Sequence, residues 1–446
     1  MKRFLILFLT ASTLLFCSAK SKSNENSNDG DTGANTTKTY SLEDYQEDFN
    51  QMVKLLLKEH PQPYAFIDKD TFDKLVNKQY NKITETTSLA KFIWICQELV
   101  AAIKCGHCEV WSKELYNVPN SMVFPMNVIY VGKQLYIIDP KNNSDKLAPG
   151  DEILSINGVN VKTLRDEMFK HISVDGFNES AKQERANALF RPYSSMFFDS
   201  PSSYKISVLK NGKVEEIILR ETKKLARSKT FLDNCDNQLC FDTNSEHNTA
   251  IITIRSFAYY KDRFPIFKSF IDSSFQYIND NQIQDLIIDL RNNVGGDPYC
   301  GSYLLQHIAT KPYIYFNKQT KGYKELKKPI QPSPSKYKNK PYILINGLCF
   351  STTGHFCAIV KENNFGIFIG DTTAGTYTCN DNSKIFTLEN TKVSCKVARN
   401  TFSTTVSTLT NKHGIIPDHY VIPTIDDFLN NTDPVLKFTW ELIEKE

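Results

Sequence analysis

From about residue 248 onward, short apolar stretches alternate with stretches in which apolar side chains recur at helical spacing. The apolar stretches predict strands at 250–254, 286–289, 342–345 and 367–370, and the periodic stretches predict helices at 266–278, 303–308 and 352–361. Such alternation is typical of an α/β layer fold, in which each helix carries the chain back to begin a parallel strand. The pattern therefore predicts an α/β domain over residues 245–446.

Two regions of different character precede this domain. Between residues 41 and 116 apolar positions recur at helical spacing, and the segment from His60 to Tyr64 (HPQPY) must end the first helix, because each proline disfavours helix in the residue before it. Residues 117–225 instead favour short strands in hairpins around Gly132-Lys133 and Asn211-Gly212. With 446 residues the chain exceeds one ordinary core, so we expect a multidomain α/β protein with a helical N-terminal region.

The N-terminus predicts export. Met-Lys-Arg is followed by an apolar run from Phe4 to Cys17, which has the length of a signal-peptide core and is too short to span a bilayer. We expect a signal peptide at 1–19, cleaved after Ala19, or a lipoprotein signal that makes Cys17 a lipid anchor. The polar residues 20–40 would form a flexible linker. The protein is thus expected to be periplasmic, membrane-anchored as a lipoprotein, or secreted.

Charge and cysteine content exclude some functions. The 53 basic residues nearly balance the 50 acidic ones, so no strong field exists to hold nucleic acid. Eleven cysteines in an exported chain suggest disulfides, and Cys235 with Cys240 is the easiest local pair. The segment from Cys105 to Cys108 (CGHC) resembles half of a zinc site, but no second pair stands at a familiar spacing. We expect no metal and no organic cofactor.

Two strand-to-helix junctions in the α/β domain carry residues that suit acyl transfer. After the first apolar strand come Gly295 and Gly296, whose backbone can expose N–H groups to a ligand. After the next comes Ser351, which would begin a helix and on position alone could be an ordinary N-cap. On adjacent parallel strands these loops would lie on one rim of the sheet and would bring donors beside a nucleophile.

Four motifs make the resemblance specific. They are DLRNNVGG at Asp289–Gly296, FSTT at Phe350–Thr353, GDTTAG at Gly370–Gly375 and GIIPD at Gly414–Asp418. In this order, over roughly residues 45–440, the chain resembles the C-terminal processing (tail-specific) serine peptidases. The segment from Leu147 to Val161 also resembles a PDZ domain. The resemblance implies a ClpP/crotonase-like catalytic core and a PDZ-like β-domain that presents the C-terminal end of a substrate chain.

The resemblance also bears on the general base. One branch of the family uses a lysine at the end of its Gly-Glu-x-Thr-x-Gly-Lys motif, and Thr376 stands at that position here. A second branch, similar to the tricorn core protease, uses a histidine before the PDZ domain, and His107 occupies the corresponding place. His107 is therefore the predicted base, and His355 is a rival one helical turn after Ser351. The acid that orients the base is left open between Asp371 and Asp418.

These residues predict an exported serine-type endopeptidase that hydrolyses polypeptides. Ser351 would be the nucleophile and His107 the base, and amides of Gly295, Gly296 and Thr352 would form the oxyanion hole. One alternative is a catalytically impaired family member that binds peptides or apolar ligands, because the lysine is replaced and no orienting acid is evident. Another is a thiol-dependent enzyme that uses Cys349 or Cys108. The oligomeric state is not predicted.

Overall fold

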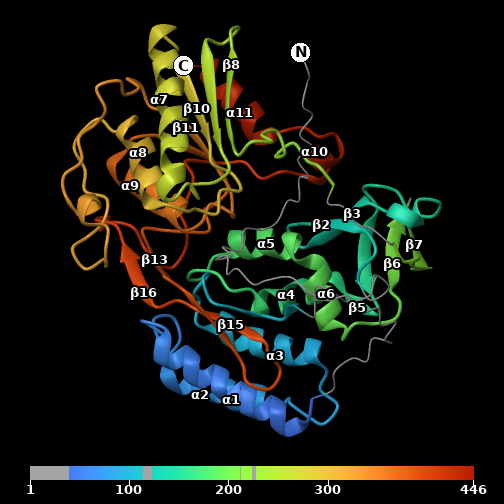
Figure 1. Ribbon diagram of the computed structural model, residues 1–446. Helices are drawn as coiled ribbons and strands as arrows, with labels where there is room; N and C mark the ends of the chain where they lie inside the picture. Colours follow the sequence, from blue (N-terminus) through green and yellow to red (C-terminus); the bar gives the residue numbers. More distant parts are fainter. Residues whose placement is uncertain (1–39, 114–122, 211, 223–227, 446) are drawn as a thin grey trace, which may run out of the picture. The chain divides into compact units, whose positions relative to one another are not determined.

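The computed structural model describes residues 40–113, 123–210, 212–222 and 228–445, and a six-stranded sheet organises the C-terminal half of the chain (Figure 1). In spatial order its strands are β17 His419–Tyr420, β12 Ile367–Gly370, β11 Tyr342–Ile345, β10 Asp285–Asp289, β9 Thr249–Ile254 and β8 Leu239–Asn244. All neighbouring pairs are parallel except β8 with β9. The predicted α/β layer with a largely parallel sheet is confirmed.

Helices cover both faces of this sheet. They are α7 Phe264–Asp280, α8 Pro298–Gln306, α9 Thr352–Asn363 and α11 Pro434–Ile443, whereas α10 Ile425–Leu429 contacts the strand β3 Gln134–Asp139 of the middle region. Because successive side chains of a strand point to opposite faces, Leu286 and Ile288 of β10 join the core beneath α7, α8 and α9, whereas Ile287 packs toward α11. Each of these buried side chains contributes about 1.5–3 kcal/mol relative to an exposed one. The sheet is therefore held rigid at the strand ends that carry the predicted site.

The predicted helical N-terminal region is present as three capped helices. They are α1 Leu42–Glu59, α2 Lys69–Tyr80 and α3 Leu89–Ala102. The side chains of Ser41, Asp68 and Ser88 each accept a hydrogen bond from an amide of the first turn, which satisfies one of the donors left open at a helix start. Helix α1 ends at Glu59, and His60 is extended, as the following prolines predict.

The middle region contains both predicted hairpins. Its strands are β2 Asn127–Val131, β3 Gln134–Asp139, β4 Glu152–Ile156, β5 Val159–Asn160, β6 Lys205–Lys210 and β7 Lys213–Ile218. Three helices that the sequence did not predict lie between β5 and β6, namely α4 Val161–His171, α5 Glu179–Ala188 and α6 Phe190–Phe197. The turn residue Asn211 lies outside the described residues. The assignment of this region as a PDZ domain stays a prediction.

Short antiparallel strands connect the C-terminal half to the N-terminal helices. They are β1 Glu109–Trp111, β13 Thr378–Asp381, β14 Lys384–Thr387, β15 Ser394–Val397 and β16 Asn400–Ser403. Strand β1 pairs with β15, and β15 also contacts α1, so these C-terminal strands lie beside the blue N-terminal helices in Figure 1. A second ribbon pairs β13 with β16. None of these five strands was predicted.

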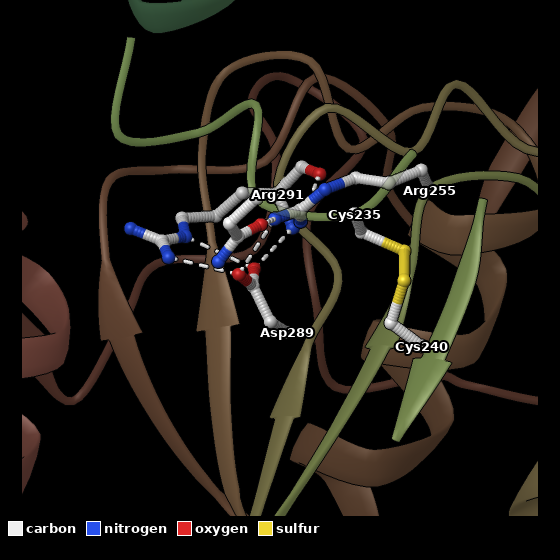
Figure 2. The surroundings of a disulfide bond; sticks show 6 residues. Cys235, Cys240, Arg255, Asp289 and Arg291 are labelled. Carbon is white, nitrogen blue, oxygen red and sulfur yellow. Dashed lines mark hydrogen bonds and ion pairs between the residues drawn. A yellow bond between two sulfur atoms is a disulfide. The ribbon is translucent and has the colours of Figure 1, made fainter. Parts of the chain in front are cut away.

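Of the remaining sequence predictions, some are tested by the structure and others lie outside the described residues. Cys235 and Cys240 form the disulfide that their spacing indicated (Figure 2). The expected signal peptide, the linker up to residue 39 and Cys17 lie outside the described residues. Among the residues that are described, no helix is both long enough and apolar enough to cross a bilayer.

Candidate active site

The loops that follow β10 and β11 are joined by hydrogen bonds. The two strands are parallel neighbours, so their carboxyl ends lie at the same edge of the sheet. Asn292 and Asn346 bind each other, since the Asn292 amide N–H donates to Asn346 Oδ1 at 3.0 Å and Asn346 Nδ2 donates to Asn292 Oδ1 at 2.8 Å. The Phe350 amide donates to the Asn293 carbonyl at 3.1 Å. The predicted juxtaposition of the glycine loop and the serine loop is therefore present.

A buried ion network anchors the start of the glycine loop. Arg291 donates to both oxygens of Asp289 at 2.9 and 2.8 Å, and Arg255 also donates to Asp289 (Figure 2). Arg291 donates in addition to both oxygens of Asp433 at 2.8 and 2.7 Å. Burial alone would raise the pKa of Asp289, but the two guanidinium groups hold it well below its usual range. Paired forks of this kind fix geometry as well as charge, so the chain leaves β10 in one defined direction.

Ser351 directly precedes helix α9 in an unusual backbone conformation, with φ 55° and ψ −122°. Positive φ is rare for a residue with a side chain and costs about 1–3 kcal/mol. Two glycines make room for it. A Cβ on Gly295 would lie 2.8 Å from the Ser351 Cβ, and a Cβ on Gly375 would lie 3.0 Å from the Ser351 nitrogen. Ser351 is half-buried, and its side chain makes no capping bond to α9.

The three predicted oxyanion donors differ in their surroundings. The Gly295 amide already donates to Asn293 Oδ1 at 2.9 Å, so this glycine supports the loop. Within the described part of the chain, the amides of Gly296 and Thr352 have no acceptor. The Thr352 hydroxyl donates to the Gly296 carbonyl at 2.6 Å and fixes these two residues relative to each other. Gly296 and Thr352 therefore offer the free donors beside Ser351.

His107 reaches the site from the turn after α3. Its ring lies against the ring of Phe350, the residue before Ser351, with centroids 4.5 Å apart. A Cβ on Gly106 would come within 2.7 Å of Phe350 Cζ, so the approach of the turn requires glycine there. His107 is 8% exposed, and its Nδ1 is buried with no hydrogen-bond partner among the described residues. His107 and Ser351, far apart in the chain, are thus brought to one site.

Strand β13 contacts both of these residues. Cys379 and Asp381 alternate along it and therefore share one side of the strand. The Ser351 hydroxyl is a hydrogen-bond partner of the Cys379 thiol, whose pKa burial raises well above its usual value. The Asp381 carboxylate lies 3.6 Å from His107 Nε2. Burial would raise the pKa of Asp381, but His107 and the Ser383 hydroxyl lower it below its ordinary value.

A second carboxylate approaches His107 from the middle region. Asp175 is buried, accepts the Gly106 amide at 2.7 Å through Oδ1, and has no described partner for Oδ2. Burial raises its pKa, and the nearby His107 opposes that effect. Neither Asp175 nor Asp381 was predicted. No local motif marks them, because their place beside His107 depends on tertiary contacts of the middle region and of the β13–β16 ribbon.

The two acids that the sequence offered for orienting the base have other partners. Asp371 accepts from the Ser180 hydroxyl at 2.5 Å and from the Thr372 amide at 2.7 Å. Asp418 accepts from Lys361 at 2.5 Å and from the Phe368 amide at 2.8 Å. These contacts hold loops at the sheet, and none of them involves His107.

Burial shifts the pKa values of two rival catalytic groups, His355 and Cys349, in the direction that opposes their use. Burial, and after it the proximity of His107, lowers the pKa of His355 to about 4. Burial raises the pKa of the Cys349 thiol to about 12. Thr376, which replaces the lysine of the other branch, donates its hydroxyl to the Thr410 carbonyl at 3.0 Å. His107 is therefore the better-placed base.

Comparisons with known proteins agree with these motifs. The sequence profile of peptidase family S41 matches residues 248–421, whereas no curated protein sequence matches the chain. Mature CPAF has a similar structure, with a TM-score of 0.65 and 13% identity over 91% of this chain and 98% of CPAF. A candidate peptidase from Parabacteroides merdae gives 0.50 and 14% identity over 90% of this chain and 96% of that one. Residues 248–421 are therefore a peptidase family S41 domain, and the protein is a serine peptidase.

Proposed function

We propose that this serine peptidase is an exported endopeptidase of the C-terminal processing kind, with Ser351 as nucleophile and His107 as base. The observation that carries the assignment is the contact of the His107 ring with Phe350, which brings a buried imidazole to the strained backbone of Ser351. Export rests on the apolar run from Phe4 to Cys17 after a basic start.

The mechanism follows from the atoms that surround Ser351. His107 takes the proton from Ser351 Oγ as the oxygen attacks a peptide carbonyl, and the carbonyl π electrons move to the oxygen. The amides of Gly296 and Thr352 donate to this oxyanion, and each such donor contributes about 2.7–4 kcal/mol to the barrier reduction. His107 then gives its proton to the leaving amine, and water releases the acyl group in the same sequence of steps.

We further propose Asp381 as the acid that orients His107. At 3.6 Å its carboxylate stabilises the imidazolium that forms when Ser351 loses its proton. The separation exceeds a hydrogen bond, and such contacts in a free enzyme commonly shorten when substrate binds. This assignment replaces Asp371 and Asp418 as candidates. The substrate class is a polypeptide whose C-terminal end the PDZ-like region would present.

The test compares turnover of a fluorogenic peptide by wild type, Ser351→Ala and His107→Ala, together with labelling by a fluorophosphonate probe. We expect both variants to lose turnover by at least about 100-fold, because each group acts in the bond-making step. Labelling should disappear in Ser351→Ala. Lactacystin, with which mature CPAF has been solved, serves as a second probe.

Matched controls separate catalysis from folding. Ser335→Ala removes an exposed hydroxyl, and His413→Ala removes a histidine whose ring binds only the Gly414 carbonyl among the described residues. Both should keep wild-type turnover. Unchanged turnover in Ser351→Ala would overturn the assignment, and peptide binding without any labelling would favour the alternative of a ligand-binding protein. Mass spectrometry of the mature N-terminus tests export and acylation of Cys17.

A further inference from the structure

Two thiols and an imidazole meet behind the turn that carries His107. An imidazole nitrogen of His60 and the Sγ atoms of Cys105 and Cys108 all lie within 4.8 Å of one another, and all three residues are buried. His60 comes from the end of α1, whereas the two cysteines flank Gly106 and His107. The proposed catalytic mechanism uses none of these three side chains.

The backbone places the two cysteines at a distance that a disulfide can span. The Cys108 amide donates to the Cys105 carbonyl at 3.1 Å, so residues 105–108 form a tight turn. The Cα atoms at the ends of such a turn are less than about 7 Å apart, which is within the reach of a disulfide. The structure nevertheless keeps both as thiols, while Cys235 and Cys240 are joined.

The surroundings of Cys108 stabilise a thiolate. The Ala398 amide donates to Cys108 Sγ at 3.4 Å. His60 Nδ1 accepts the Gln62 amide at 3.2 Å, so the proton of the neutral ring is on Nε2, which is buried and has no other partner in the described part of the chain. An N–H that faces the sulfur atoms favours the charged form of a thiol.

The expected charges of the two thiols differ. A hydrogen bond from Cys105 lowers the pKa of Cys108 below its ordinary value, with His60 and the Ala398 amide acting in the same direction and burial opposing them. The pKa of Cys105 is raised, first by its hydrogen bond to Cys108 and then by burial. Asp175 and Cys395 also face this pair, and both disfavour a second negative charge there.

We propose that Cys105 and Cys108 form a redox-active dithiol couple whose disulfide changes the position of His107. A low-molecular-weight disulfide is the oxidant. The Cys108 thiolate attacks one of its sulfurs and releases one thiolate, which takes the proton of Cys105 and becomes a thiol. The Cys105 thiolate then attacks the Cys108 sulfur of the mixed disulfide and releases the second sulfur as a thiolate. Two protein thiols are oxidised and one external disulfide is reduced.

Closing this bond constrains the turn that contains His107, because Gly106 and His107 are the two residues between the bonded cysteines. The sulfur atoms, up to 4.8 Å apart, must approach to about 2 Å, so the Cys105 and Cys108 side chains must reorient at the two ends of the Gly106-His107 turn. That backbone is held by Asp175 and packs on Phe350. We therefore expect at least about tenfold lower kcat/KM in the oxidised protein, because small displacements of a reacting group cost rate steeply. This effect on rate rests on the proposed function, whereas the redox couple does not.

The experiment is a glutathione redox titration of the full mature protein, read by thiol alkylation and peptide mass spectrometry. A stabilised thiolate makes a disulfide easier to reduce, so the Cys105–Cys108 pair should titrate at a ratio of glutathione to its disulfide at which Cys235–Cys240 stays oxidised. Thiolate absorbance near 240 nm should persist to a lower pH than that of an ordinary thiol, should be lost in Cys108→Ser and should be reduced in His60→Ala. Cys300→Ala, which removes another buried thiol, should leave both readouts unchanged.

Several outcomes decide the proposal. It is overturned if no Cys105–Cys108 disulfide forms in excess oxidised glutathione, if both pairs titrate together, or if a tightly held zinc ion accompanies the purified protein and blocks alkylation of both thiols. The titration of wild type stands even where Cys108→Ser does not fold. Redox-dependent turnover in wild type that is absent in Cys105→Ser supports the link to His107. Loss of all peptidase activity with an intact redox couple would instead contradict the proposed function.

Discussion

Ser351 illustrates how one side chain depends on its neighbours for a conformation that it would not adopt alone. Its positive φ persists because the Phe350 amide is bonded to Asn293 and because Gly295 and Gly375 leave space on both sides. Strain of this kind survives only where surrounding contacts determine the backbone. The serine is thereby held away from an ordinary capping position, and its hydroxyl points to the side of the helix start where Cys379 lies.

The carboxylate beside His107 gives a prediction at the same scale. Asp381→Asn should lower kcat/KM by a factor on the order of 10² to 10⁴, because a neutral amide cannot stabilise the imidazolium or fix its tautomer. The acid limb of the pH–rate profile should move with it. Asp371→Asn is the matched control and should retain activity. Equal losses in the two variants, measured with the same peptide, would refute the role of Asp381.

At the scale of elements, the packing of α3 against α4 makes stability depend on pH. His171 of α4 stacks on Trp94 of α3 with centroids 3.6 Å apart, and one of its ring nitrogens lies 2.8 Å from the Trp94 carbonyl. Burial lowers the pKa of His171 to about 3, although Glu98 opposes this shift and Lys82 and Lys170 add to it. The imidazole must therefore stay neutral for the two helices to remain packed.

The sign of the effect follows from the two protonation states. The folded pKa lies below the unfolded value of 6.5, so the unfolded chain binds more protons between about pH 6.5 and 3. Stability from His171 is complete above 6.5 and falls by up to about 1.4 kcal/mol per pH unit below it. Urea unfolding at several pH values should show a flatter dependence in His171→Gln than in wild type. His413→Gln should not change the slope.

The elements differ in how much the sequence could predict of them. Strands β11 and β12 were predicted with their exact bounds, because each is a short apolar run buried on both faces. The strands of the β13–β16 and β14–β15 ribbons have partly exposed, mixed side chains, and β15 also pairs with the distant strand β1. Apolar periodicity in a sequence reflects burial. Strands whose residues are half-exposed therefore show no periodic pattern from which they could be predicted.

At the scale of the whole molecule, contacts between the two ends of the chain carry stability. Asp48 of α1 is 1% exposed and accepts from the Asn390 amide, the Thr391 amide and the Thr391 hydroxyl at 2.9, 2.7 and 2.6 Å. Asp48→Ala should lower the free energy of unfolding by about 2–4 kcal/mol, because hydrogen bonds to a charged group contribute about 1.5–3 kcal/mol each and are not additive. Chemical denaturation measures this loss. The exposed Glu43→Ala, on the same helix, should change it little, and equal effects would contradict the prediction.

For a related reason, only part of the candidate site could be predicted from the sequence. Gly296, Ser351 and Thr352 follow strand ends, so the sequence pattern alone placed them on one edge of the sheet. His107 came from the family resemblance, since nothing in its own surroundings distinguishes it from a buried structural histidine. Asp381 and Asp175 were missed, because each reaches His107 only after several elements have packed.

The pairing of β1 with β15 also determines when, during synthesis of the chain, the candidate site can be completed. A chain made from its N-terminus contains residue 107 long before residue 351 exists, and the strand that pairs beside the His107 turn, β15 at Ser394–Val397, is later still. Nascent chains therefore carry His107, the proposed base, without Ser351, the proposed nucleophile, and later carry both without the strand β15 that pairs beside the His107 turn. With these proposed roles, peptidase activity is expected only after strand β15 has been synthesised and has paired with β1, so synthesis of the chain precedes its activity.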